Sequence, residues 1–401
     1  MTARALQGSE LLAWYATGIY DRPDGVVRRL AGSLPIALER RITVPLQRFA
    51  RPGLPPEKVI SLGWHEWAER IAAKAGMREL ARLLDERGNA AFGPMLVRKL
   101  DRELPAGLWG YNGSALSLFS HPAAKGSVKV LDRTIGDWRE WNEILRHLQS
   151  EEPEWLLPRD QIVPQSRIDR DDEEFALADA VVCGAPMVRE TIVRHSPVSD
   201  IEDKVRVLPY CFDPNLFGAP PSRAERLNEP LRLLFVGHLS ARKGVHHILR
   251  AIKCFSPRAV SLTLVGELAV PKRTFAPFAD RVTWHRTVPR SGIPAMMREN
   301  DVLVLPSYFE GSAIVLLEAL ASGLAIIQTR QAGLGASAQS GIVLDRPDND
   351  LLREAIERLL NDRPSIAGMQ AAAQAEAREY SFQYYLANIT NLARELTMVE
   401  R

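Results

Sequence analysis

The stretch VLVLPSYFEGSAIVLLEALASGLAIIQT, from Val302 to Thr329, decides the fold of this 401-residue chain. Its first residues form a short, continuous apolar run of the kind that lies buried in a parallel sheet. The helix-forming segment that follows has apolar residues on more than one face, which indicates burial, and Gly323 predicts its C-cap. The stretch therefore predicts a buried strand, a loop, a buried helix and a second strand: Val302–Leu305, Ser307–Gly311, Ser312–Ala321 and Leu324–Gln328.

Two glutamates bracket this helix, with seven residues between them. Glu318 lies inside an apolar helix, where a carboxylate is costly unless it has a partner. Glu310 lies just before the first turn, beside a helix N-terminus, which is where anions bind. We therefore expect a ligand that carries both hydroxyl groups, for the carboxylates, and phosphates, for the backbone N–H groups.

The alternation of strands and helices extends outward on both sides of this stretch, as it does in doubly wound sheets. The C-terminal half predicts further elements at Leu231–Val236, Val245–Phe255, Ser261–Val265, Val282–His285, Ile293–Arg298, Gly341–Leu344 and Leu351–Leu360. The N-terminal half predicts elements at Leu108–Tyr111, Gly113–Lys125, Val128–Leu131, Trp138–Glu151, Asp169–Ala178, Asp179–Cys183, Pro186–Arg194 and Val205–Leu208. The polar segment Phe217–Pro230 is predicted to link the two halves.

The composition is that of an ordinary globular protein, with 46% hydrophobic and 25% charged residues. A formal net charge of +2 gives no indication of nucleic-acid binding. Three cysteines lack CxxC spacing, and no apolar run approaches the roughly 18 residues of a membrane span. We expect a cytoplasmic enzyme, with peripheral contact at the inner membrane face left open. Val26–Arg51 is rich in arginine and is either a solvated helical face or a surface for an anionic acceptor or lipid headgroup.

Two loops after predicted strands of the C-terminal half carry candidate binding groups. In the loop Gly237–Gly244, Arg242 and Lys243 open a helix, so two cations, backbone N–H groups and a helix dipole converge on a place that suits a diphosphate. The alternative is an exposed basic helix start. The Gly266-Glu267 turn lets a base or ribose approach the backbone, and the alternative is a plain turn.

The histidines of this half do not predict a metal site. His246 and His247 are consecutive in a predicted helix, so we expect them on different faces, and no pair of acidic residues accompanies them or His238.

Taken together, these features resemble the donor domain of retaining GT-B glycosyltransferases of family 4 (glycosyl transferases group 1). The resemblance covers roughly residues 175–390. It rests on Gly237…Arg242-Lys243-Gly244, Gly266-Glu267, the E-x7-E motif from Glu310 to Glu318 with Gly311-Ser312-Ala313-Ile314 and Ala319–Gly323, and the segment VRVLPYCFDPNLF at Val205–Phe217.

The resemblance implies a role for each matched residue. Arg242 and Lys243 would bind and stabilise the leaving diphosphate, and Glu310 would contact the donor sugar; these three are the predicted catalytic residues. Backbone N–H groups at the helix start would bind phosphate, and Glu318 would hold the ribose hydroxyls. The predicted donor-binding residues are Gly237, Gly266, Glu267, Ser307, Gly311, Ser312, Ala313, Ile314 and Glu318. No metal and no cofactor are expected.

The implied architecture is α/β, with two Rossmann-like domains that face a cleft. We expect an acceptor-binding domain over residues 1–208, a nucleotide-sugar donor-binding domain over 209–380, and a C-terminal helix over 381–401 that packs back toward the N-terminal domain. The N-terminal domain lacks the first strand that the family has, so we expect either a start upstream of Met1 or a truncated domain. Many relatives also carry a histidine near the donor sugar in the loop that here reads Asp132–Asp137, where Arg133, Thr134 and Asp137 are candidates to line the site.

The implied function is that of a hexosyltransferase in polysaccharide or glycoconjugate biosynthesis. It would transfer a hexose from a nucleotide-diphosphate sugar to a sugar, lipid-linked or small-molecule acceptor, with retention at the anomeric carbon and without a metal. Two alternatives stay open: a GT-B sugar-nucleotide epimerase, and a non-catalytic protein that binds sugar nucleotides.

Overall fold

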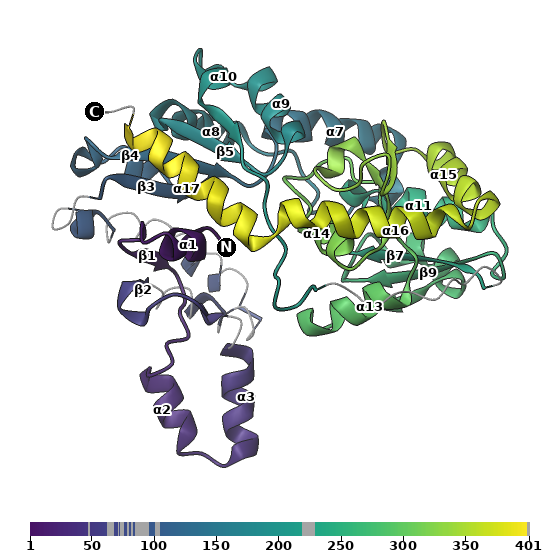
Figure 1. Cartoon of the computed structure of the whole chain (residues 1–401), viewed down its shortest axis with the longest axis horizontal. Helices are drawn as coiled ribbons and strands as arrows, with labels where there is room; N and C mark the ends of the chain where they lie inside the picture. The colour runs from purple at the N-terminus through teal and green to yellow at the C-terminus, as the bar shows by residue number, and fades with distance from the viewer. Residues whose placement is uncertain are drawn as a thin grey trace. The chain divides into compact units, whose positions relative to one another are not determined.

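The computed structural model describes residues 1–46, 49–61, 68–70, 72, 76–77, 80–81, 83–84, 96–100, 105–218 and 229–398. These form two compact units (Figure 1). The first comprises residues 1–131, 177–179 and 386–401, and the second comprises residues 132–176 and 180–385. Residues 219–228 of the predicted linker lie outside the described part of the chain.

A six-stranded parallel sheet forms the centre of the second unit, in the order β11-β9-β7-β12-β13-β14. Its strands are β7 (Leu231–Val236), β9 (Val260–Val265), β11 (Thr283–His285), β12 (Val302–Leu305), β13 (Ala325–Thr329) and β14 (Gly341–Leu344). All residues of β12 and β13 are buried, as predicted for strands covered on both faces. The chain builds one half of the sheet from β7 outward and then crosses to β12. The β7–β12 junction is therefore the topological switch point, where ligands bind in such folds.

The helices of this sheet are α11 (Val245–Lys253), α12 (Lys272–Phe275), α13 (Ile293–Glu299), α14 (Ile314–Ala321), α15 (Asn349–Asn361) and α16 (Ser365–Glu376). Helix α14 is buried from Leu316 to Ala321, which agrees with its apolar residues on every face. Helix α15 begins at Asp348, whose carboxylate accepts the N–H groups of Asp350 and Leu351.

A four-stranded sheet has the order β3-β4-β5-β6, formed by Gly107–Tyr111, Val128–Arg133, Ala180–Cys183 and Val205–Val207. The second unit also contains α7 (Trp138–Glu151), α9 (Pro186–His195) and α10 (Ile201–Lys204), and α8 spans Gln165–Leu177. The predicted helix at Gly113–Lys125 is wrong as a single element, since it is split into α6 (Leu116–Phe119) and a 3-10 turn at Pro122–Ala124. His121 precedes Pro122 and is extended, because a residue before proline is disfavoured in the helical region.

The first unit begins with α1 (Thr2–Gly8), which is shorter than the helix that the sequence predicts over Thr2–Trp14. Strands β1 (Tyr15–Thr17) and β2 (Val59–Ser61) pair with each other in a separate sheet, and α2 (Val26–Gly32) and α3 (Ile36–Leu46) lie between them in sequence. Helix α17 (Phe382–Met398) ends the described chain, and its Thr390 hydroxyl is hydrogen bonded to that of Ser9.

Among the helices described, none has both the length and the hydropathy that crossing a bilayer requires. The division into three segments drawn from the sequence, and the cytoplasmic location, stay predictions.

Candidate functional site

Two loops leave the carboxyl ends of the neighbouring strands β7 and β12 and pack tightly against each other. The first loop forms a 3-10 turn at Ala241–Lys243 and ends at Gly244, whose φ of 67° lies in the left-handed region. A Cβ at Gly244 would lie 2.0 Å from the carbonyl oxygen of Pro306, so only glycine fits there. The N–H of Tyr308 donates to the carbonyl of Arg242 at 2.9 Å. These backbone contacts fix the relative position of the two loops.

The packed loops bring together the three predicted catalytic residues. Lys243 Nζ lies 2.5 Å from one carboxylate oxygen of Glu310, and the Arg242 guanidinium lies 3.1 Å from the other. Arg242 also donates to the carbonyl of Phe309, and the Ser307 hydroxyl donates to Glu310 at 3.2 Å. The structure thus joins Arg242, Lys243, Ser307 and Glu310 in one cluster.

Charge and burial oppose each other at this cluster. Burial by itself raises the pKa of Glu310, but the charges and hydrogen bonds of Lys243 and Arg242 outweigh it, and the net pKa lies below its usual value. The pKa of Lys243 is lowered, because burial and the Arg242 charge outweigh the attraction of Glu310. Glu310 is ionised at neutral pH and faces two cations, which leaves a local excess of positive charge for an anionic ligand.

The N-terminus of α14 follows directly. The hydroxyl of Ser312 is buried and has no hydrogen-bond partner within the described residues. The N–H of Ala313 donates to the carbonyl of Ala332 at 3.3 Å, so this group is engaged within the protein. The described part of the chain supplies no acceptor for the N–H groups of Ser312 and Ile314. Unpaired donors at a helix N-terminus bind anions readily.

Glu318 lies on the buried side of α14 and pairs with a residue that sequence reasoning missed. Arg290, in a 3-10 turn before α13, donates to the Glu318 carboxylate at 2.7 Å. Burial raises the pKa of Glu318 even though Arg290 opposes it. Arg290 is more than half exposed, so the pair opens onto solvent on one side. No motif marks Arg290, and only the expectation that a buried carboxylate needs a partner could have suggested it.

The predicted base-binding turn lies beside the first loop. A Cβ at Gly266 would lie 1.9 Å from the carbonyl oxygen of Gly237, so these two glycines let the loops after β7 and β9 touch. The carbonyl of Glu267 accepts the N–H of Leu239 at 2.9 Å. Trp284 donates its indole N–H to the Gly266 carbonyl at 2.9 Å and remains 37% exposed, which places an accessible aromatic ring next to the turn. Sequence reasoning did not single out Trp284.

The loop that follows β4 packs against the Glu310 loop. A Cβ at Gly311 would lie 1.8 Å from the carbonyl oxygen of Thr134, and one at Gly136 would lie 2.5 Å from the Phe309 ring. Of the three residues considered for this wall, Arg133 is fully buried and Asp137 caps α7, so neither is free to line a cavity.

The Arg133 side chain instead holds this loop in place. It donates to the carbonyls of Ile135 and Gly136, at 2.8 and 2.7 Å, and forms an ion pair with the buried carboxylate of Asp171. This clamp holds Thr134–Gly136 against the segment that carries Glu310.

The expectation that His246 and His247 occupy different faces of their helix is wrong. Both side chains are buried and both contact the Tyr308 hydroxyl, His247 at 2.6 Å and His246 at 3.3 Å. The side-chain oxygen of Asn349 accepts a hydrogen bond from the other ring nitrogen of His247 at 2.7 Å. Burial lowers the pKa of both histidines, so they are neutral at pH 7 and hold Tyr308, next to the Glu310 loop, by hydrogen bonds.

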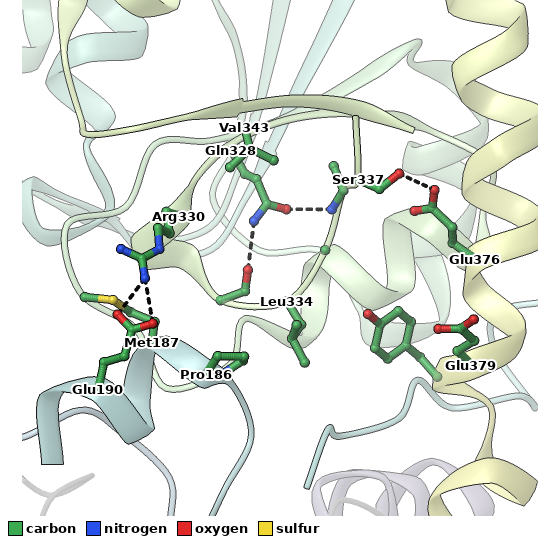
Figure 2. A pocket seen from close by; sticks show the side chains of 14 residues that line it. Pro186, Met187, Glu190, Gln328, Arg330, Leu334, Ser337, Val343, Glu376 and Glu379 are labelled. Carbon is green, nitrogen blue, oxygen red and sulfur yellow. Dashed lines mark hydrogen bonds and ion pairs between the residues drawn. The ribbon is translucent and has the colours of Figure 1, made fainter. Parts of the chain in front are cut away.

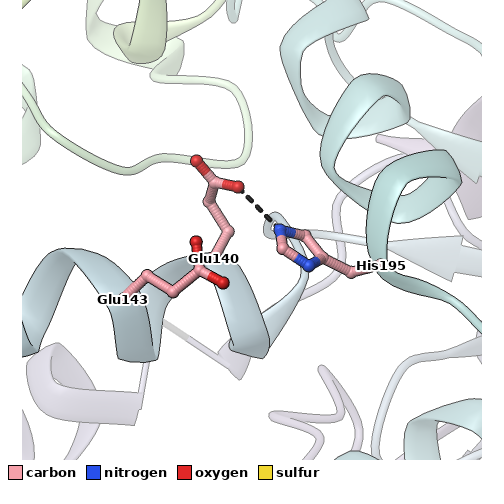
Figure 3. Close-up of side chains that lie close together, drawn as sticks. All are labelled: Glu140, Glu143 and His195. Atoms are coloured by element: carbon pink, nitrogen blue, oxygen red, sulfur yellow. Dashed lines mark hydrogen bonds and ion pairs between the residues drawn. The ribbon is translucent and has the colours of Figure 1, made fainter.

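Away from these loops, Glu140 and Glu143 on α7 and His195 on α9 form the one cluster with metal-ligating atoms found in the described ranges (Figure 3). Their ligand atoms lie within 4.8 Å of one another. One carboxylate oxygen of Glu140 already contacts His195 at 2.8 Å and Arg194 at 3.0 Å. The Arg194 guanidinium is therefore a cation beside this cluster. The absence of a metal from the donor site stays a prediction.

A cavity of about 390 Å³ lies at the carboxyl end of β13 (Figure 2). Its polar groups are largely paired with each other: Arg330 with Glu190 at 2.6 Å, and Ser337 with Glu376 at 2.5 Å. Gly333 lines this cavity and packs against Ser312, so the cavity neighbours the N-terminus of α14.

Residues 230–362, which carry all the predicted site residues, match the family model for glycosyl transferases, group 1. The chain is 27% identical over 342 residues to D-inositol 3-phosphate glycosyltransferase of Corynebacterium urealyticum, an alignment that covers 74% of this chain and 78% of the relative. The matched segment is a glycosyltransferase domain of the group 1 type. A second relative, alpha-maltose-1-phosphate synthase of Mycolicibacterium smegmatis, is 27% identical over 46% of this glycosyltransferase and 54% of its own length.

Solved structures show the fold. Sucrose-phosphate synthase from Thermosynechococcus elongatus superposes with a TM-score of 0.64 at 18% identity, over 78% of this chain and 79% of the other. Anabaena HepE in complex with UDP superposes with a TM-score of 0.59 at 15% identity, over 76% and 82%. The predicted fold class, α/β of the GT-B type, is confirmed.

Proposed function

We propose that this glycosyltransferase transfers a hexose from a nucleotide-diphosphate sugar to a hydroxyl group of an acceptor, with retention at the anomeric carbon and without a metal. The observation that carries the proposal is the cluster of Arg242, Lys243 and Glu310 beside the N-terminus of α14. Two cations and a helix N-terminus with unpaired donors suit a diphosphate, and a carboxylate between the cations suits a sugar hydroxyl.

In this proposal the bond between the anomeric carbon and the diphosphate oxygen breaks, and the electron pair leaves with the diphosphate. Negative charge therefore grows on the leaving group, where Arg242 and Lys243 stabilise it together with the unpaired donors of Ser312 and Ile314. The acceptor oxygen bonds to the anomeric carbon, and its proton passes to the departing diphosphate. Lys243 and Arg242 thus take the electrostatic role that a divalent cation has in other transferases.

The remaining residues bind the donor. Glu318 would accept hydrogen bonds from the ribose hydroxyls and exchange part of its contact with Arg290 for them. The Gly266-Glu267 turn and the exposed ring of Trp284 would flank the base. A nucleotide-sugar donor agrees with the UDP and UDP-glucose named for the HepE complexes.

The test is product analysis with a sugar-labelled donor and a panel of hydroxyl acceptors. We expect a new glycoside whose anomeric configuration, determined by NMR, equals that of the donor, at a rate that a chelator does not change. An epimerised donor would support the epimerase alternative. A bound donor that is neither hydrolysed nor transferred would support a non-catalytic binding protein, and an inverted product would contradict retention.

A further inference from the structure

We infer that the hairpin of α2 and α3 (Val26–Leu46) docks on the surface of an anionic lipid bilayer. The two helices lie side by side and are joined at the lower end of the view in Figure 1. The hairpin belongs to the first unit and contains none of the donor-site residues. The inference therefore stands apart from the proposed function.

The joined end of the hairpin exposes large apolar side chains. Leu30 is 65% exposed, Ile36 is 70% exposed and Leu38 is 48% exposed, whereas Ala31 is buried. The three exposed residues lie within nine positions of one another, around the turn at Ser33–Pro35. Isolated exposed apolar residues are common. Three that share the end of one hairpin form an apolar surface that we expect to be buried against a binding partner.

Positive charge surrounds this apolar end. Residues 25–46 contain four arginines (28, 29, 40 and 41) and one acidic residue, Glu39, for a net charge of +3. Arg28 is engaged by Asp21 at 2.7 Å, while Arg29 and Arg40 have exposed side chains close in sequence to Leu30 and Leu38. Apolar side chains flanked by arginines are typical of elements that insert shallowly at an anionic membrane surface.

The shape of the surface favours a bilayer over a protein partner. A stable protein–protein interface buries roughly 800 Å² on each side, which three side chains at the end of a narrow hairpin do not supply. Lipids adapt to a protruding end, and long arginine side chains reach back to the headgroups while the leucine and isoleucine side chains enter the acyl region.

Co-sedimentation of the full chain with lipid vesicles tests the inference. We expect binding to vesicles of phosphatidylcholine mixed with phosphatidylglycerol, little binding to phosphatidylcholine alone, and loss of binding at high salt. Leu30→Ser with Ile36→Ser should abolish binding. Arg29→Ala with Arg40→Ala should weaken it about fivefold per arginine, or roughly 25-fold in total.

Matched variants on the second unit serve as controls. Ile162→Ser with Tyr384→Ser removes other exposed apolar groups, and Arg194→Ala with Arg346→Ala removes other exposed cations. These should bind vesicles as the wild type does. The inference is overturned if the wild type binds neither vesicle, if it binds both equally, or if the control variants lose as much binding as the hairpin variants. It is also overturned if the hairpin variants change the sedimentation mass of the lipid-free protein, which would assign the surface to a second copy of the chain.

Discussion

Glu310 precedes helix α14 and Glu318 lies within it, and the two carboxylates have opposite pKa shifts. Glu310 contacts two cations, which hold its pKa below the usual value despite burial. Among the described residues, Glu318 forms its ion pair with the largely exposed Arg290, and burial prevails, so its pKa is raised. Glu310 is therefore a fixed anion inside a cationic cluster, whereas Glu318 gains most from a ligand that donates hydrogen bonds to it.

Replacement of Glu318 by Gln should weaken the binding of nucleoside diphosphates by about 10- to 100-fold, because charge-assisted hydrogen bonds to a ribose contribute about 1.5–3 kcal/mol. Isothermal titration calorimetry measures the affinity. The matched control is Glu357→Gln on α15, which breaks an exposed ion pair with Arg353 and should leave the affinity unchanged. An unaltered affinity of E318Q would remove Glu318 from ribose binding.

The depressed pKa of Glu310 predicts a pH-dependent contribution to stability. Its ionised form is favoured in the folded state, so the contribution is fully present above the ordinary pKa of 4.5 and is lost as the pH falls through the lower folded pKa. Urea unfolding of the wild type and of Glu310→Gln should show a free-energy difference that is constant at neutral pH and shrinks below pH 4.5. A difference that does not vary with pH would mean that Glu310 is not held by Lys243 and Arg242.

The sequence predicted the residues of this cluster because they stand in motifs with fixed spacing after recognisable strands. Arg290 and Trp284 could not be predicted in this way, since each lies in a loop or short strand without a motif, and only the tertiary structure brings them to Glu318 and Gly266. The buried position of Arg133 could not be predicted from the sequence either. A charged residue in a polar loop predicts exposure, and its partner Asp171 lies 38 positions away.

At the scale of elements, the donor site depends on loops that touch through glycines. Gly244, Gly266 and Gly311 each lie where a Cβ would be 2.0 Å or less from a backbone carbonyl oxygen. A backbone carbonyl cannot move aside as the end of a flexible side chain can. These contacts therefore set the distances between the loops that follow the strands, and with them the geometry of the charged cluster.

Gly311→Ala should lower the free energy of unfolding by about 1–3 kcal/mol and reduce the transfer rate, because the new methyl group displaces the Glu310 loop from Thr134. Thermal unfolding and a donor-consumption assay measure the two effects. Gly368→Ala is the matched control, because a Cβ there meets open space inside α16, and it should stabilise the protein by up to about 1 kcal/mol. Equal behaviour of the two variants would contradict the role assigned to the close contact.

The clamp formed by Arg133 and Asp171 gives a second prediction at this scale. Arg133→Met should destabilise the protein by about 3–5 kcal/mol, since it leaves a buried carboxylate unpaired, whereas Arg133→Met with Asp171→Leu should recover much of that loss. Chemical unfolding measures both values. In the double variant, turnover should still fall, because the clamped loop packs against the segment that carries Glu310. A double variant that is no more stable than the single variant would contradict the clamp.

Strands that are covered on both faces were the easiest to predict, because a short, continuous apolar run is typical of a buried strand in a parallel sheet. The six strands of the central sheet of the second unit and the helix α7 lie within a few residues of their predicted bounds. The errors fall where backbone chemistry overrides hydrophobic pattern: Pro122 divides one predicted helix, and α1 ends at Gly8. The convergence of His246 and His247 on Tyr308 was missed because helical periodicity does not describe a side chain that reaches across a loop.

At the scale of the whole molecule, the groups proposed to bind the donor all belong to the second unit. Its sheet places the loops proposed to bind phosphate at the switch point between β7 and β12. The first unit contains the strand pair β1–β2 and the α2–α3 hairpin, and none of its described residues belongs to the cluster of Arg242, Lys243 and Glu310. Donor affinity and membrane attachment should therefore vary independently among variants.

The most direct test of the donor site is calorimetric titration of UDP, GDP and ADP into the wild type and into Lys243→Ala, with Lys253→Ala at the far end of α11 as the matched control. The wild type and the Lys253→Ala variant should bind the preferred diphosphate with equal affinity. The Lys243→Ala variant should bind it at least about tenfold more weakly, since a charge-assisted contact to phosphate is lost. Equal affinities of the wild type and the Lys243→Ala variant, or no binding of any of the three diphosphates to the wild type, would contradict the assignment of this cluster as the diphosphate site.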